Sequence, residues 1–107
     1  MSATEAALRL LGLAARAGAV LSGTERVRIA ARAGTLHQVL VAGDISANTH
    51  DKLIPLLEAR AVRYRIVATR AALGAAVGKP PAGALGILDA GLARRVATLL
   101  DSEEENS

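Results

Sequence analysis

At 107 residues, of which 51% are hydrophobic and 21% charged, the chain is long enough for one globular domain and too short for two. It has no cysteine, which excludes disulfides, thiolate metal ligands and cysteine nucleophiles, and it has no apolar run of the roughly 18 residues that a membrane span needs. Residues 1–100 hold all 13 basic side chains but only six of the ten acidic ones, so their net charge of +7 favours a polyanionic partner such as nucleic acid.

A first helix is predicted over residues 5–17. Ser2 and Glu5 have the spacing of a capping box at its start, and Gly18 provides a stop. Alanine and leucine cover most of its circumference, which indicates a helix that is buried on most sides. The remaining positions form one stripe at helical spacing: Glu5, Arg9, Gly12 and Arg16.

A second helix is predicted between the S-x-x-E start signal of residues 22–25 and a stop at Gly34. A projection at 100° per residue separates an inner face from a basic outer face with one isoleucine at its middle. The inner face carries Val27, Ala30 and Ala31, and the outer face carries Glu25, Arg28, Ile29 and Arg32. Residues 37–42 (HQVLVA) follow as a buried strand candidate.

Turn residues at 43–48 lead into a further helical stretch, which Pro55 is expected to divide into two short pieces because proline lacks the amide hydrogen. Residues 63–68 (RYRIVA) alternate like a strand. Thr69 can then cap a short alanine-rich helix that stops at Gly78.

The remaining elements are a loop over residues 79–83, a strand over residues 84–88 and a final helix that Asp89 caps and that ends at about Leu100. Because helices and strands alternate along the chain, we predict an internal sheet with helices on both faces. Residues 1–100 would form this single domain, and residues 101–107 (DSEEENS) are expected to be a disordered acidic tail.

No catalytic constellation is evident. The sequence GAAVGKP at 74–80 is one residue short of a phosphate-binding P-loop, and Pro80 stands where magnesium binding needs a hydroxyl. His50 neighbours Asp51, but residues i and i+1 do not face each other on a helix. We therefore predict neither an enzyme nor a metal or cofactor site, and the start of the chain, which is unlike a signal peptide, favours the cytoplasm.

Five segments, in matching order and spacing, give the chain its resemblance to a known family. They are LLGLAARAGAVLSGTE (10–25), VLVAGDIS (39–46), IPLLEARAVRY (54–64), ATRAALGAAVGK (68–79) and GALGILDAG (83–91). In these segments the chain resembles the kink-turn-binding ribosomal proteins of the L-seven-Ae and L-thirty-e group, especially their small bacterial members. The resemblance covers residues 8–100 and implies an L-thirty-e-like α/β/α sandwich with a small mixed sheet, together with binding to sharply bent RNA.

The resemblance also implies where RNA would bind. In the family, a motif reading G-x-N-E-x-x-K opens the second helix and faces the RNA. Gly23 and Thr24 match it, whereas Glu25 replaces the usual asparagine, Arg26 the usual glutamate and Ile29 the usual lysine. The flanking RNA-facing parts correspond to the turn at residues 43–45 and the loop at 79–83. The RNA-binding residues implied or supported by charge are Gly23, Thr24, Glu25, Arg26, Arg28, Ile29, Arg32, Asp44, Ile45, Lys79, Pro80, Pro81 and Ala82.

The leading hypothesis is thus a monomeric RNA-binding protein associated with the ribosome or with translation. It would recognise a kink-turn or a similarly bent RNA through the start of its second helix and two loops. The alternative is an adaptor with the same fold that has lost kink-turn recognition and binds a protein partner through the surface around Ile29. A steep dependence of binding on salt would distinguish RNA contacts through phosphates from an apolar protein contact.

Overall fold

The computed structural model describes residues 1–105, the last three of them through their backbone alone. Four strands form one mixed sheet in the order β1-β4-β2-β3. Their bounds are Val20–Ser22 for β1, Gln38–Val41 for β2, Tyr64–Ile66 for β3 and Ala84–Ile87 for β4. β4 is antiparallel to both of its neighbours, and β2 is parallel to β3. The sheet is small and mixed, as the resemblance implied.

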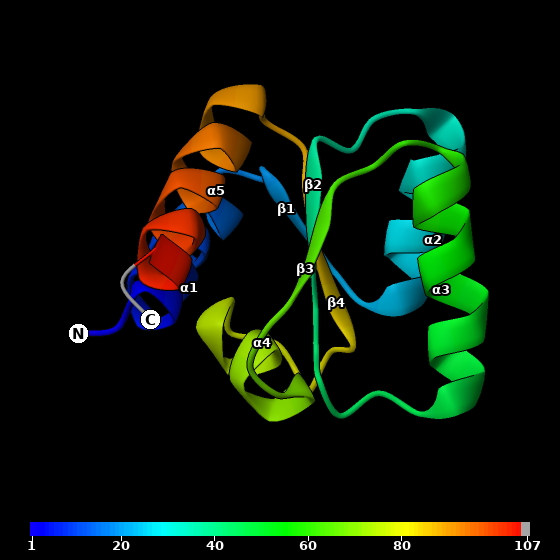
Figure 1. The fold of residues 1–107 in the computed structure, drawn as a ribbon, viewed down its shortest axis with the longest axis horizontal. Coiled ribbons are helices and arrows are strands. Elements are labelled where there is room, and N and C mark those ends of the chain that lie inside the picture. Colours follow the sequence, from blue (N-terminus) through cyan, green and yellow to red (C-terminus); the bar gives the residue numbers. More distant parts are fainter. Residues whose placement is uncertain (106–107) are drawn as a thin grey trace.

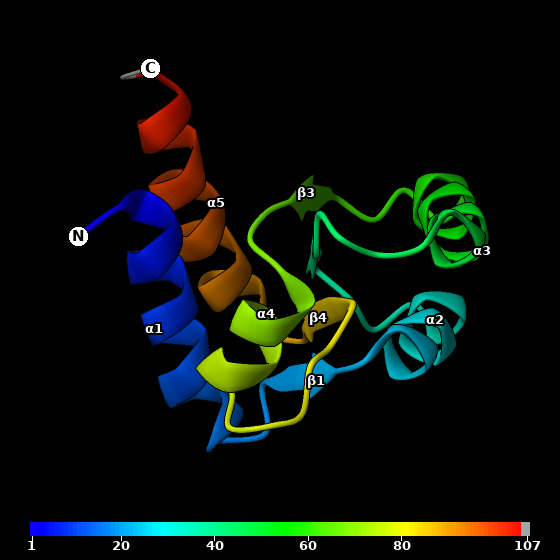
Figure 2. The ribbon, with the colours of Figure 1, turned by 90° about the horizontal axis from the view of Figure 1, so that it is seen from below.

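Helices cover both faces of this sheet. α1 (Ala3–Ala15), α4 (Arg70–Ala76) and α5 (Ala90–Glu105) lie on one face, and α2 (Thr24–Ala33) and α3 (Ala47–Ala59) lie on the other (Figures 1 and 2). Each crossover between strands thus returns the chain through a helix packed on the sheet. The predicted three-layer α/β/α sandwich is confirmed.

The side chains of β2 explain why both faces need cover. Val39 and Val41 are fully buried in the cluster beneath α2 and α3, whereas Leu40, one residue out of phase, is fully buried in the cluster beneath α1, α4 and α5. Successive strand residues point to opposite faces, so a strand with apolar residues on both faces requires a helical layer on each side. Burial of one such side chain stabilises the fold by about 1.5–3 kcal/mol.

Three predicted helix starts are confirmed by their hydrogen bonds. Ser2 and Glu5 form both bonds of the capping box at α1. The Thr69 side chain accepts from the Ala72 amide at 3.1 Å, and Asp89 Oδ2 accepts from the Leu92 amide at 2.7 Å. Each cap satisfies an amide that has no partner within its own helix.

Pro55 does not divide α3, so the prediction of two short helical pieces is wrong. The helix runs continuously from Ala47 to Ala59. A proline inside a helix costs roughly 3 kcal/mol, but Leu53, Ile54 and Leu57 are buried on the inner face of the same helix and together contribute more than that. Pro55 itself is exposed, where water can reach the backbone carbonyl that loses its helical bond.

Two further differences concern strand β1 and the end of the last helix. Residues 20–22 form strand β1, which the sequence did not predict, so Ser22 belongs to the strand and Gly23 is the N-cap of α2. At the other end of the chain, α5 continues to Glu105, where the sequence led us to expect a disordered tail from residue 101. Arg65 of β3 contacts this part of the helix, because its Nη1 donates a hydrogen bond to Asp101 Oδ1 at 2.6 Å. Residues 106 and 107 lie outside the described part of the chain.

Candidate nucleic-acid interface

The start of α2 presents backbone donors that no side chain caps. Gly23 has φ 114° and ψ 143°, a conformation suited to glycine. Because this N-cap residue has no side chain, the first-turn amides of α2 have no side-chain acceptor. The Gly23 amide itself donates to the Ala84 carbonyl at 2.9 Å, which fixes the helix end to β4. A helix N-terminus also carries a partial positive charge, so this end can accept a phosphate or a base-edge acceptor.

Gly83 brings the predicted site segments together. A Cβ added to Gly83 would lie 2.7 Å from Thr24 Cγ2 and 3.1 Å from Ile45 Cγ2. The Gly83 carbonyl also accepts from the Ala42 amide at 2.8 Å, which ties the loop before β4 to the turn after β2. The start of α2, the 43–45 turn and the 79–83 loop therefore form one continuous surface, as the predicted site requires.

Asp44 has a structural role within this surface. Its Oδ1 accepts from the Arg70 amide at 2.8 Å, and its Oδ2 lies 3.6 Å from Arg70 Nε. The carboxylate thereby binds the first residue of α4 and positions the turn in which Ile45 is half-buried. Asp44 shapes the interface through this contact, and its negative charge is partly neutralised by Arg70.

The loop after α4 exposes three of its four predicted site residues. Lys79, Pro80 and Pro81 are exposed, and the Lys79 amide donates to the Gly74 carbonyl at 2.9 Å. Ala82 differs from the prediction, because it is only 5% exposed and packs in the core cluster. Its amide donates to the Arg70 carbonyl at 3.0 Å. Ala82 therefore anchors the loop and does not offer contact surface.

The outer face of α2 carries the residues that the helical projection placed there, but not all of them are exposed for contact with RNA. Val27, Ala30 and Ala31 are buried, as predicted. Ile29 is 58% exposed, and Arg26 and Arg32 are exposed. Arg28 is different, because its side chain is only 23% exposed and forms an ion pair with Glu25.

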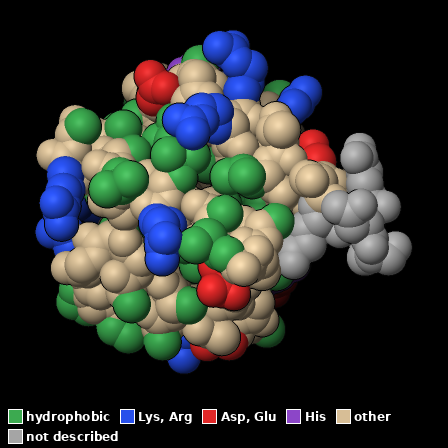
Figure 3. All heavy atoms as spheres, turned by 90° about the vertical axis from the view of Figure 1, so that its left-hand side faces the viewer, with side chains coloured by type: hydrophobic (Ala, Val, Ile, Leu, Met, Phe, Trp, Pro, Cys, Tyr) green, Lys and Arg blue, Asp and Glu red, His purple; other side chains and the backbone are tan. Residues whose placement is uncertain are grey.

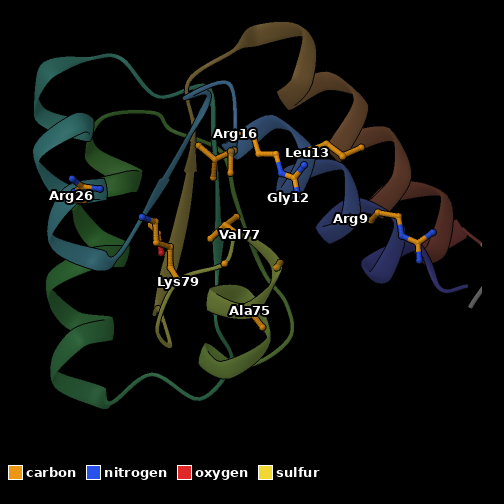
Figure 4. Close-up of a pocket in the computed structure, with 13 residues that line it drawn as sticks. Arg9, Gly12, Leu13, Arg16, Arg26, Ala75, Val77 and Lys79 are labelled. Atoms are coloured by element: carbon orange, nitrogen blue, oxygen red, sulfur yellow. The ribbon is translucent and has the colours of Figure 1, made fainter.

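A basic groove extends this interface toward α1. It has a volume of about 510 Å³ and runs between the second half of α1, strand β1, the start of α2 and the end of α4. Four cationic residues line it, and no acidic residue does: Arg9, Arg16, Arg26 and Lys79. A smaller hollow lined by Ser22, Gly23, Arg26 and the 79–82 loop continues from it. Figure 4 shows Arg26 and Lys79 on one side of the groove and Arg16 and Arg9 on α1 at the other, with Arg9 farthest from Arg26 and its side chain directed away from it.

Arg9 and Arg16 were not expected at a site from the sequence, although the stripe that contains them is visible in it. Gly12, in the same stripe, shows which neighbouring element this face of α1 meets. A Cβ at Gly12 would overlap the Ala76 carbonyl of α4, so glycine at this position allows α1 and α4 to pack closely beside the groove. Helical spacing indicates which residues share a face but not which other element that face meets.

No group of three or more histidine, aspartate or glutamate side chains in the described part of the chain could hold a metal ion. Among the same residues, no helix is both long and apolar enough to cross a membrane. What the described surface offers is a patch of helix-end amides and cations beside two ordered loops.

Comparison with known proteins identifies relatives of this chain. The chain is 37% identical over 92 residues to the RNA-binding protein YlxQ of Bacillus subtilis (strain 168), an alignment that covers 86% of this chain and 92% of YlxQ. A solved structure from Bacillus halodurans C, described as a protein with unknown function, has a TM-score of 0.82 and 37% identity over 89% of this chain and 96% of that one.

The Giardia lamblia 15.5kD RNA binding protein has a TM-score of 0.72 at 24% identity, over 92% of this chain and 84% of that one, and shows the same fold. The model of the ribosomal protein L7Ae/L30e/S12e/Gadd45 family matches residues 5–97. That match spans most of the chain, with every strand and all or part of every helix, and it confirms the resemblance seen in the sequence. The chain belongs to the ribosomal protein L7Ae/L30e/S12e/Gadd45 family.

Proposed function

We propose that this protein binds kink-turn RNA, or RNA bent to a similar degree, through the start of α2 and the two loops that flank it. The observation that carries the proposal is the meeting of these three segments at Gly83, where Thr24 and Ile45 both approach the same backbone position. The 37% identity to a protein named as RNA-binding supports the same class of partner.

The chemistry of this surface suits RNA in two ways. The uncapped amides of α2 and the cations Arg26 and Lys79 can contact phosphates and base edges. Pro80 and Pro81 are exposed and conformationally stiff, so they can present an apolar surface to an unstacked base. Phosphate contacts would supply affinity, and the fixed arrangement of the helix end and loops would select the bent shape.

In this proposal the protein acts in the cytoplasm with ribosomal or other translation-related RNA, as a monomer and without enzymatic activity. Recognition would depend on binding alone, because the surface offers amide donors, cations and apolar loop residues for contact, and its carboxylates Glu25 and Asp44 are paired with arginines.

Binding of a kink-turn RNA and of an uninterrupted duplex, each titrated with salt, tests the proposal. The Arg26→Gln/Lys79→Gln variant should lower the salt slope on the kink-turn by about 1.8 if each cation contacts one phosphate. Arg94→Gln/Arg95→Gln, which removes the same charge from exposed positions on α5, is the matched control and should change the slope little. Equal affinity of the native protein for both RNAs would contradict selection of bent RNA.

A second candidate function rests on the exposure of Ile29. This side chain is 58% exposed at the middle of the outer face of α2, where a protein partner could dock in place of RNA. Such an adaptor would bind its partner with little salt dependence. Absence of measurable binding to either RNA at low salt would favour this function over the first.

A further inference from the structure

The basic groove along α1 has a volume of about 510 Å³, against about 190 Å³ for the smaller hollow at the start of α2, and it lies beyond that hollow. Its distant end is formed by α1, a helix that the candidate interface does not use. The groove and the interface share Arg26 and Lys79 and are therefore continuous. A ligand that occupies the start of α2 and extends along the surface would enter the groove.

We infer that this groove holds the helical arm of the RNA that leads away from the bend, with Arg9 and Arg16 contacting its phosphates. The inference rests on the proposed function and adds to it a second contact region on a different helix. The two arginines are separated by two turns of α1, or about 10.5 Å along its axis. An extended polyanion can lie across both of them, whereas a single small anion cannot.

The charges in the groove favour a polyanion, although the negative ends of two helix dipoles border it. The C-terminal parts of α1 and α4 both border the groove, and a helix C-terminus carries about half a negative charge. Four full positive charges outweigh these two partial ones. Neither Arg9 nor Arg16 has an ion-pair partner among the described residues, so both guanidinium groups are available for phosphates, unlike that of Arg28.

The surface between the two arginines is also suited to an RNA backbone. Leu13 lies between them on α1 and is 64% exposed, so it can contact the apolar side of a ribose while the arginines contact phosphates on either side. Contacts to sugar and phosphate carry no sequence information. The groove is therefore expected to recognise an RNA arm of any sequence. The face of the molecule formed by the α1 side carries separate basic side chains among apolar ones (Figure 3).

The test compares a minimal kink-turn RNA, whose arms end close to the bend, with versions in which one arm or the other is lengthened. Native protein should bind one lengthened version more tightly, with a salt slope greater by about 1.8. Arg9→Gln/Arg16→Gln should lose this gain and keep native affinity for the minimal RNA. Arg9→Lys/Arg16→Lys should retain the gain, because charge is preserved.

Arg94→Gln/Arg95→Gln, with the same loss of charge from α5, should retain the gain in full, and thermal unfolding should show that all variants remain folded. If the minimal RNA binds but neither longer arm adds affinity, or if the gain survives in Arg9→Gln/Arg16→Gln, the groove does not hold the arm and the proposed function stands. If the minimal RNA itself does not bind, the proposed function fails, and the inference fails with it.

Discussion

Glu25 and Arg28 form an ion pair one turn apart on α2, with Arg28 Nη1 donating to Glu25 Oε2 at 2.9 Å. Arg28 Nε is buried and has no hydrogen-bond partner among the described residues. The arginine that the helical projection placed on the RNA-facing side is therefore held against its own helix. Arg26, which lines both the groove and the smaller hollow, is the more available cation.

Replacing Glu25 with glutamine should tighten RNA binding. The change removes a negative charge beside the start of α2 and releases Arg28, so the salt slope should rise by about 0.9 if Arg28 then contacts a phosphate. The fold should lose roughly 1 kcal/mol, because an acidic side chain in the first turn and an exposed ion pair both stabilise a helix modestly. Filter-binding titrations at several salt concentrations measure the first effect, and unchanged affinity at low salt would contradict the prediction.

Ile29→Lys should convert the protein into a tighter kink-turn binder. Ile29 is 58% exposed, so a lysine can reach solvent there and should change stability by no more than about 0.5 kcal/mol. It occupies the position where the family motif has lysine, and one charged contact to a base edge or phosphate is worth roughly 1–3 kcal/mol. Affinity should be compared on a kink-turn and on an uninterrupted duplex at fixed salt and magnesium. An equal gain on both RNAs would show only a charge effect.

Gly83→Ala should weaken both the fold and RNA binding. The new Cβ would lie 2.7 Å from Thr24 Cγ2, so the Thr24 side chain or the backbone beside it must shift, at a cost of about 1–3 kcal/mol. Gly43→Ala is the matched control, because its Cβ would meet the Ala68 carbonyl at 3.4 Å and Ile66 Cγ2 at 3.9 Å, both of them ordinary contacts. Chemical denaturation and RNA titration of both variants measure the two effects. Native-like RNA affinity in Gly83→Ala would show that the close approach at this position is not needed for binding.

Tyr64 offers a pH-dependent probe of the contact between α3 and β3. Its hydroxyl donates to Glu58 Oε1 at 2.8 Å, and this hydrogen bond, aided by desolvation and the Glu58 charge, raises the pKa of Tyr64 above 10.0. Because the folded-state pKa is raised, the bond stabilises the fold below pH 10 and this contribution disappears as pH rises through the folded-state pKa. The chain has one tyrosine and no tryptophan, so tyrosinate absorbance reports this group alone.

Glu58→Gln should lower the pKa of Tyr64 toward its ordinary value, because the charge of the acceptor is removed. Asp51→Asn, at an exposed position of the same helix, is the control and should leave the titration unchanged. An identical titration curve for Glu58→Gln and the native protein would mean that the bond does not persist in solution.

The sequence by itself determined most helices, three of the four strands and the inner face of α2, because these depend on local capping, turn residues and apolar periodicity. The capping side chains form hydrogen bonds with backbone amides only three residues further along the chain, as at Ser2, Thr69 and Asp89. Such interactions are the same in a short segment as in the whole protein, so their pattern can be read directly along the chain. The family resemblance added the location of the candidate RNA surface.

Only the tertiary structure decided the rest, because it depends on which elements meet. Strand β1 has three residues and forms by pairing with β4, and α3 continues through Pro55 because its buried face outweighs the lost hydrogen bond. Arg9 and Arg16 line a groove with Arg26 and Lys79 because Gly12 allows α1 to pack closely against α4. Arg9 and Lys79 are far apart in the sequence, so their shared groove could not be predicted from it. The groove forms because α1 and α4 pack side by side on one sheet.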